Sequence, residues 1–324
     1  MLEELITLCK GRCRCNPIRN FSATQVLEAT EYFKSSFHDD ARYEWYKGVL
    51  DGRPVLIKRY ERIEYFNTVK DSCRDIAISS HMSAHKYALK LFGCCLEFPY
   101  PVLVYENEEI IGPLNVSGGT DSNGLALSWR QRLKIAKDVA YAITYLHTAF
   151  LRPIIHRNIT ESNILLDKNY VPKLCNFNLA ISIPEGETYV EVDVLIGTFG
   201  YPDPHYLRTQ IITEKTDVYS FGVLLLVLVT GKKPFDRSRP TGLENICTYV
   251  TDLVDKEQFN DIVDQKMLEE EGGGNEEQRK LQFRAFIELA LRRVEEEMED
   301  RPQMIDVAKE LVKINRFVVL RSAS

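Results

Sequence analysis

The 324-residue sequence predicts an α+β fold with two lobes, a small β-rich N-terminal lobe and a larger helical C-terminal lobe. Apolar and aromatic stretches flank Asp51-Gly52, which predicts a β-hairpin because both turn positions favour positive φ. Beyond Asp217 the apolar residues recur with helical spacing, and residues 223–229 are wholly apolar. A hydrophobic content of 44% is enough for a substantial core.

The N-terminal lobe is expected to begin with a short helix. Ser22 and Gln25 form a capping box, and Phe21 can pack against Val26 as a hydrophobic staple, so the helix is expected to run to about Phe33. Strands rich in apolar and aromatic residues are then expected at residues 43–50, 54–60, 88–95 and 102–106.

The C-terminal lobe is expected to be mainly helical. Ser128 and Gln131 form a second capping box, which predicts a helix behind them. Its apolar stripe recurs at three- and four-residue steps: Leu133, Ala136, Ala140, Ile143 and His147. We expect residues 1–20 to be an N-terminal extension and residues 21–324 to form the domain, with lobes at about 21–107 and 108–324.

Several short motifs follow one another in the order and spacing of a phosphoryl-transfer enzyme. Residues 155–163 (IHRNITESN) have the layout of a catalytic loop, and residues 174–180 (LCNFNLA) that of a magnesium-holding segment. Further motifs lie at residues 55–58 (VLIK), 197–204 (GTFGYPDP), 217–222 (DVYSFG) and 300–302 (DRP). From about residue 21 to about residue 314, the chain resembles a protein kinase.

Other features narrow this resemblance. Residues 21–25 (FSATQ) and 93–97 (GCCLE) are similar to plant receptor-like kinases. Amides at both 158 and 176, with residues 98–101 (FPYP) and 146–150 (LHTAF), resemble the plant receptor-like cytoplasmic pseudokinases of the ZRK family. That resemblance implies an adaptor role beside an intracellular nucleotide-binding, leucine-rich-repeat (NLR) immune receptor.

Asparagines occupy both positions where kinases use aspartate as base and as metal ligand. Asn158 cannot take up a hydroxyl proton at neutral pH, and losing a positioned base costs about 10²–10⁴ in rate. Asn176 offers magnesium a neutral amide oxygen, a poor substitute for a carboxylate. Thr160 also replaces the usual loop lysine. We therefore expect a catalytically deficient pseudokinase with no metal site, whose two asparagines hydrogen-bond their own loops.

Nucleotide binding stays open at this point. The three glycine positions of the family's phosphate loop fall at His38, Asp40 and Tyr43, where side chains block the approach of backbone N–H groups to phosphates. Lys58 matches the nucleotide lysine and Asn163 the second magnesium contact, so weak residual ATP binding through these two residues is one alternative. In the other alternative, Lys58 forms a structural ion pair or is exposed, and no cofactor binds.

Three contacts of the scaffold depend on charged residues. Asp75 fits as the partner of the nucleotide lysine only with a one-residue gap. Asp217 is expected to tie the catalytic-loop backbone to the central helix. Arg301 needs a partner beyond the activation segment, and because His205 occupies the usual glutamate position, Asp203 is the alternative.

Composition limits the partners. A net charge of −6 and a pI of about 5.7 argue against general nucleic-acid binding. No transmembrane segment is expected, since spanning a bilayer takes roughly 20 apolar residues. The spacing of the eight cysteines is not typical of a disulfide framework, which predicts reduced thiols and a cytoplasmic location. Recruitment to the inner face of the plasma membrane through partners is left open. Cys9, Cys13 and Cys15 are expected to be ordinary thiols, with palmitoylation or metal binding as the alternatives.

Residues 178–203 are the strongest candidate for a partner-binding surface. Thr188, Tyr189 and Thr198 are candidate sites of modification by another enzyme. Four acidic residues suit a basic partner: Glu185, Glu187, Glu191 and Asp193. The resemblance implies that an effector-modified kinase or a bacterial effector docks here, while the small lobe or a helix face binds the receptor's leucine-rich repeats. A plain solvated loop, a weakly active or unconventional Ser/Thr kinase and another nucleotide-dependent transferase remain alternatives.

Overall fold

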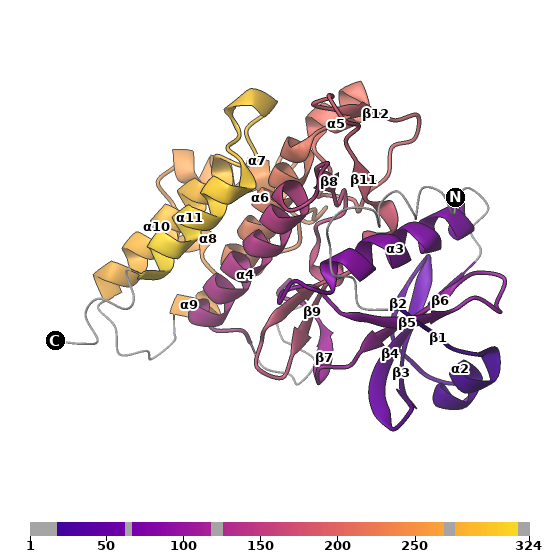
Figure 1. Cartoon of the computed structure of the whole chain (residues 1–324). Helices are drawn as coiled ribbons and strands as arrows, with labels where there is room; N and C mark the ends of the chain where they lie inside the picture. Colours follow the sequence, from indigo (N-terminus) through magenta and orange to yellow (C-terminus); the bar gives the residue numbers. More distant parts are fainter. Residues whose placement is uncertain (1–17, 62–66, 118–125, 269–275, 317–324) are drawn as a thin grey trace. The chain divides into compact units, whose positions relative to one another are not determined.

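The computed structural model describes residues 18–61, 67–117, 126–268 and 276–316 and divides the chain into two compact units (Figure 1). The β-rich unit comprises residues up to 113 together with 164–180, and the helical unit comprises residues 114–163 and those from 181 onward. This architecture confirms the predicted α+β class, with strands concentrated in the first unit and helices in the second.

The β-rich unit is built on a six-stranded sheet in the order β1-β5-β6-β4-β3-β2, and a three-stranded sheet has the order β10-β9-β7. The strands are β1 Arg19–Asn20, β2 Ser36–Asp40, β3 Tyr43–Leu50, β4 Arg53–Tyr60, β5 Leu91–Cys95, β6 Val102–Glu106, β7 Ile110–Pro113, β9 Ile164–Asp167 and β10 Pro172–Leu174. The helices are α2 Ala23–Ala29, α3 Thr68–Met82 and the 3₁₀ turn η2 Phe177–Leu179.

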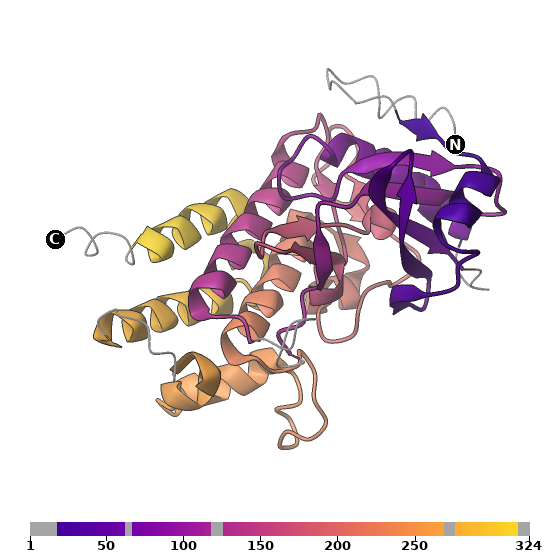
Figure 2. The same cartoon turned by 90° about the horizontal axis from the view of Figure 1, so that it is seen from below.

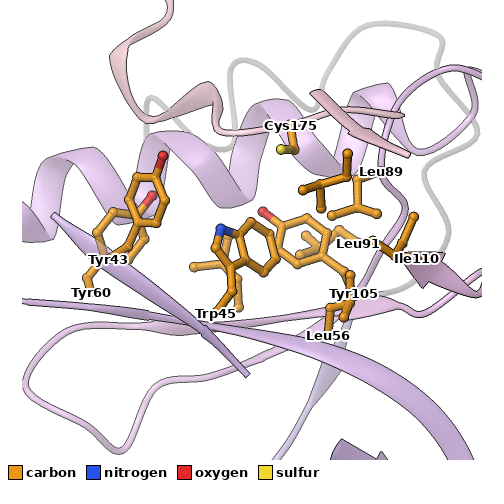
Figure 3. Packing of buried hydrophobic residues seen from close by; sticks show 11 residues of the cluster. Tyr43, Trp45, Leu56, Tyr60, Leu89, Leu91, Tyr105, Ile110 and Cys175 are labelled. Carbon is orange, nitrogen blue, oxygen red and sulfur yellow. The ribbon is translucent and has the colours of Figure 1, made fainter. Parts of the chain in front are cut away.

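The two faces of the large sheet carry separate cores, because successive side chains of a strand point to opposite faces. One core gathers around α2 and contains Phe21, Val26, Tyr46, Leu50, Val55 and Ile57. The other lies on the side of α3 and contains Tyr43, Trp45, Leu56, Tyr60, Tyr105 and Cys175 (Figure 3). The second core includes Tyr43, one of the three predicted phosphate-loop positions.

The predicted hairpin is confirmed. Asp51 and Gly52 have φ values of 51° and 72°, and Leu50 pairs with Arg53 across the turn. The capping box of α2 is also present. However, α2 ends at Ala29, so the expected end near residue 33 is wrong.

The early end of α2 has a local cause. The Thr30 hydroxyl donates to the Val26 carbonyl at 2.8 Å, and the Phe33 amide donates to that hydroxyl at 3.1 Å. Glu31, Tyr32 and Phe33 then take left-handed φ values of 49°, 60° and 59°, which turn the chain away from the helix axis.

The N-terminal boundary also differs from the expected one. Residues 19–20 are not an extension, because β1 pairs in parallel with β5 through Gly93 and Cys94. A Cβ at Gly93 would lie 2.5 Å from the Arg19 carbonyl oxygen, so glycine permits this pairing. Residues 1–17, with the three N-terminal cysteines and the expected helix near the start, lie outside the described residues.

Residues 164–180 return to the β-rich unit, although the sequence placed them in the other lobe. Strand β9 pairs with both β7 and β10, and the Leu89 amide donates to the Leu174 carbonyl at 3.0 Å. The β7–β9 pairing and the Leu89–Leu174 hydrogen bond join residues more than 50 positions apart, so no local pattern predicts them.

The helical unit is organised around α6, in which every residue from Thr216 to Thr230 is buried. In Figures 1 and 2, α11 lies alongside α4, and α10 packs on α6. The helices are α4 Trp129–Thr148, α5 Pro204–Thr209, α6 Glu214–Thr230, α7 Ile246–Asp255, α8 Phe259–Ile262, α9 Gln265–Leu268, α10 Glu276–Leu291 and α11 Met304–Arg316, with 3₁₀ turns η1 Glu161–Asn163 and η3 Met298–Asp300. Two-residue strands are β8 Ile154–Ile155, β11 Ile181–Ser182, β12 Val190–Glu191 and β13 Ile211–Ile212.

The predictions for α4 and α6 are confirmed. The capping box of α4 is present, and all five members of its predicted stripe are buried. The apolar run 223–229 is the buried centre of α6, whose C-terminus is closed by Gly231 at φ 65°. In the part of the chain that the structure describes, no helix combines the length and apolarity needed to cross a bilayer.

Candidate functional site

The loop that carries Asn158 is held by side chains of its own and by Thr198 of the later segment, so the Asn158 side chain bonds outside its own loop, contrary to expectation. The buried Asn158 accepts a hydrogen bond from the Thr198 hydroxyl at its Oδ1, at 2.7 Å. Its backbone carbonyl accepts one from the Asn163 Nδ2 at 2.7 Å, and the hydroxyls of Thr160 and Ser162 lie 3.0 Å apart. Asn158 and Asn163 thus act as structural members of the loop.

Asp217 supports this loop from α6, as the sequence predicted. Its carboxylate accepts the backbone amides of His156 and Arg157 at 2.7 and 2.9 Å, and lies 3.0 Å from His147 Nε2. Arg157 has a left-handed φ of 68°, an uncommon conformation for a residue with a side chain. The two hydrogen bonds from backbone amides to the fully buried Asp217 carboxylate stabilise that turn.

Arg301 pairs with Asp203, which settles the alternative that the sequence left open. Its two terminal nitrogens donate to the two carboxylate oxygens at 2.6 and 3.0 Å, in the bidentate geometry that guanidinium favours. Its Nε donates to the Glu295 carbonyl at 2.7 Å. Asp203 also accepts the His205 amide at 2.9 Å and so caps α5. His205 itself has no part in the pair.

Glu161 is a buried member of the loop that sequence reasoning missed. Its Oε1 accepts the amides of Val116 and Ser117 at 2.6 and 3.0 Å, and its Oε2 accepts the Ser117 hydroxyl at 2.8 Å. Burial raises the pKa of Glu161, although these hydrogen bonds act in the opposite direction.

In the β-rich unit, Lys58 is a fully buried structural ion pair. Its Nζ lies 2.7 Å from Asp75 Oδ2 and 3.0 Å from the Tyr60 hydroxyl, and no part of the side chain is exposed. Burial lowers the pKa of Lys58, and the Asp75 carboxylate opposes that effect. The one-residue gap and the shorter aspartate therefore do not prevent the pairing.

Asp75 is saturated with hydrogen-bond donors. Its Oδ2 accepts from Lys58 and from the Tyr60 hydroxyl, both at 2.7 Å. Its Oδ1 accepts from the Ser79 hydroxyl at 3.1 Å and from the Phe177 amide at 3.0 Å. One carboxylate thereby joins β4, α3 and η2.

Asn176 precedes η2 in the left-handed conformation, with φ 65°, which asparagine tolerates better than most residues. Its Nδ2 donates to the Tyr43 hydroxyl at 2.8 Å. His38 and Asp40 lie in β2 and pair with Trp45 and Tyr43 of β3. The predicted phosphate-loop positions thus lie in an antiparallel hairpin whose register shifts between Ser36 and His38.

Most of the predicted site residues form two groups, one in the helical unit and one in the β-rich unit. Asn158, Thr160, Asn163 and Thr198 are brought together in the helical unit. Lys58 and Asn176 both contact Tyr43 in the β-rich unit. Thr188 and Tyr189 are exposed in the segment before β12, away from these contacts.

Sequence reasoning missed the role of two tyrosines. Tyr60 contacts both members of the buried ion pair. The Tyr206 hydroxyl accepts from the Ile196 amide at 2.9 Å and from Arg157 Nη2 at 3.0 Å. A signal existed for the first, because a two-residue turn at 51–52 fixes Tyr43 opposite Tyr60 and Trp45 opposite Lys58. No local pattern indicates the second.

Comparison with known proteins agrees with this arrangement. The protein kinase domain family matches residues 46–313, well over half of the chain. The chain belongs to the protein kinase family. Serine/threonine-protein kinase ZRK1 of Arabidopsis thaliana is 43% identical over 320 residues, which cover 97% of this chain and 89% of that relative. The non-functional pseudokinase ZED1 of the same plant is 44% identical over 321 residues, covering 98% of this chain and 94% of ZED1.

Within the kinases, the chain is therefore a ZRK-family member, which confirms the resemblance inferred from its motifs. Serine/threonine-protein kinase ZRK4 of Arabidopsis thaliana is 42% identical over 337 residues, covering 98% of this chain and 91% of ZRK4. The names of these relatives differ on activity, since ZRK1 and ZRK4 are called kinases and ZED1 a non-functional pseudokinase. Membership alone thus does not decide whether this ZRK-family chain transfers phosphate.

Proposed function

We propose that this chain is a catalytically deficient pseudokinase that acts as an adaptor. In this role it links a plant NLR immune receptor, bound through its leucine-rich repeats, to a pathogen effector or to an effector-modified kinase. The observation that carries the proposal is an intact scaffold around altered catalytic positions. Asp217 and the Arg301–Asp203 pair keep their contacts, whereas amides replace both catalytic carboxylates.

The hydrogen bonds of Asn158 and Asn176 support the proposed loss of phosphoryl-transfer activity. A base must accept a proton in the transition state, and the Asn158 Oδ1 is engaged with Thr198. A carboxylate is a strong magnesium ligand, whereas Asn176 offers only a neutral amide, whose Nδ2 donates to the Tyr43 hydroxyl. Both residues serve the fold of their own units.

The surface before α5 supports a binding role. Four apolar side chains of this segment are exposed by 43–72%: Tyr189, Val194, Leu195 and Phe199. They lie in the same segment as Glu185, Glu187, Glu191 and Asp193, so the surface combines apolar contact area with negative charge. Such a surface fits a partner that presents basic groups around an apolar patch.

A weakly active or unconventional Ser/Thr kinase is the second candidate, favoured by the similarity to ZRK1 and ZRK4, which are both called serine/threonine-protein kinases. Incubation of purified protein with ATP labelled at the γ-phosphate, Mg²⁺ or Mn²⁺ and a generic substrate separates the two. Turnover no higher than that of Lys58→Met, checked for folding by circular dichroism, supports the pseudokinase. Turnover clearly above this control supports the second candidate, and transfer of an α-phosphate label indicates another transferase.

The adaptor role is tested by co-purification from plant cytosol with mass spectrometry of the bound chains. Charge reversal at the exposed Lys34 and Arg53 should remove the receptor, whereas changes at Thr188 or Thr198 should leave it bound and weaken capture of the modified kinase. The opposite pattern would overturn the assignment of faces. Absence of any receptor peptide would refute the adaptor proposal.

A further inference from the structure

Lys58 and three aromatic side chains, Tyr43, Trp45 and Tyr60, lie together on one face of the β3–β4 hairpin. In the register of β3 and β4, Tyr43 lies opposite Tyr60 and Trp45 opposite Lys58, so all four side chains point to the same face. The ring centroids of Tyr43 and Tyr60 are 6.0 Å apart, and those of Tyr43 and Trp45 are 6.5 Å apart, both edge to face. Figure 3 shows these rings beneath α3.

Asp75, Tyr60 and Tyr43 surround the Lys58 ammonium. An ammonium group carries three N–H donors. Asp75 and the Tyr60 hydroxyl accept two of them, at 2.7 and 3.0 Å. The ammonium also lies 3.9 Å from the centroid of the Tyr43 ring, within the range of a cation–π contact.

Tyr43 is held in place from both ends. Its ring contacts Tyr60 and Trp45, and its hydroxyl accepts from Asn176 Nδ2 at 2.8 Å. Only 1% of the residue is exposed. Protein kinases keep glycine in this loop so that it can cover the phosphates, and they direct the lysine at those phosphates. Here the loop position holds an aromatic ring, and that ring covers the lysine.

We propose that Tyr43 acts as an internal ligand of Lys58 that takes the place of nucleotide phosphates and closes the β-rich unit to nucleoside triphosphates. The inference goes beyond the proposed loss of catalysis, because it concerns binding of a polyphosphate anion and assigns it to one residue. Removing the ring should recreate an anion site at Lys58. Removing only the hydroxyl should not, because the ring would still cover the ammonium.

The test measures binding of ATP and of inorganic triphosphate, each with and without Mg²⁺, by thermal shift and calorimetry. Wild type and Tyr43→Phe should show no shift and no heat. Tyr43→Ala should melt earlier without ligand and gain about 5–11 °C at a hundredfold excess over Kd, since binding then adds about 2.7 kcal/mol. Adding Lys58→Met to Tyr43→Ala should abolish that gain. A Lys58-dependent response in wild type, or a folded Tyr43→Ala variant that binds neither anion, would overturn the proposal.

A second measurement uses wild-type protein and decides the case even where Tyr43→Ala fails to fold. An acyl-phosphate derivative of ATP transfers its acyl group to lysine amines beside bound phosphates. Lys58 should stay unmodified, whereas the exposed Lys34 reports the background reaction. Acylation of Lys58 that free ATP suppresses would refute the inference. Such a protein could still be inactive towards labelled ATP, so failure of this inference is distinct from failure of the proposed function.

Discussion

The buried pair of Arg301 and Asp203 should be the most sensitive charged contact of the helical unit. In Asp203→Ala the guanidinium keeps backbone carbonyls and the Tyr219 ring as partners but no carboxylate, and both residues of the pair are at most 1% exposed. Breaking such a pair costs about 3–5 kcal/mol, because one buried charge remains uncompensated. For a unit of this size each kcal/mol lowers Tm by about 2–4 °C, so we expect a decrease of about 6–20 °C in thermal unfolding followed by circular dichroism.

A matched control lies on the same helix. Arg208 of α5 pairs with Glu296 at 3.0 Å, but the two side chains are 55% and 74% exposed. Arg208→Ala should therefore cost less than about 1 kcal/mol. Asp203→Asn should fall between the two variants, because asparagine still caps α5 while the charge is lost. A decrease in Asp203→Ala no larger than in Arg208→Ala, or a double-mutant cycle with Arg301→Ala that shows no coupling, would refute the reasoning.

Three further predictions concern the loop and its supports. Asp217→Ala should lower the free energy of unfolding by about 2–6 kcal/mol, measured in urea, because two buried amides lose their acceptor; a loss below 1 kcal/mol would contradict this. Restoring aspartate at Asn158 and Asn176 together should leave phosphoryl transfer from labelled ATP at background, since the lysine stays covered; clear turnover would show that only the carboxylates were missing. Burial raises the pKa of Glu161 in the folded protein above its ordinary value of 4.5. Its contribution to the free energy of unfolding is therefore greatest below pH 4.5 and declines as pH rises through the folded pKa. Over that pH range, wild type should lose stability relative to Glu161→Gln. A difference that is constant with pH would exclude this linkage.

Local signals in the sequence predicted local structure. The capping boxes, the Asp-Gly turn and the apolar run of α6 each depend on residues within a few positions of one another, and all are confirmed. The predicted end of α2 was wrong because Glu31, Tyr32 and Phe33 take left-handed φ values, which the apolar pattern does not reveal.

Long-range partners were harder to predict. The two candidate partners of Arg301, Asp203 and His205, lie two positions apart in the sequence. Only the fold of residues 197–204 directs the Asp203 carboxylate towards Arg301. The return of residues 164–180 depends on strand pairing between β7 and β9. For Lys58, the sequence named Asp75 but not the aromatic neighbours, because the register of a hairpin places side chains opposite one another without regard to motif spacing.

The buried Lys58–Asp75 pair has a consequence for the cell. Under the proposed exclusion of nucleotides by Tyr43, the folded population should not rise or fall with the supply of adenine nucleotides, because a ligand stabilises only a protein that binds it. The amount of folded protein should then be set by its synthesis and turnover and should be independent of the ATP level of the cell.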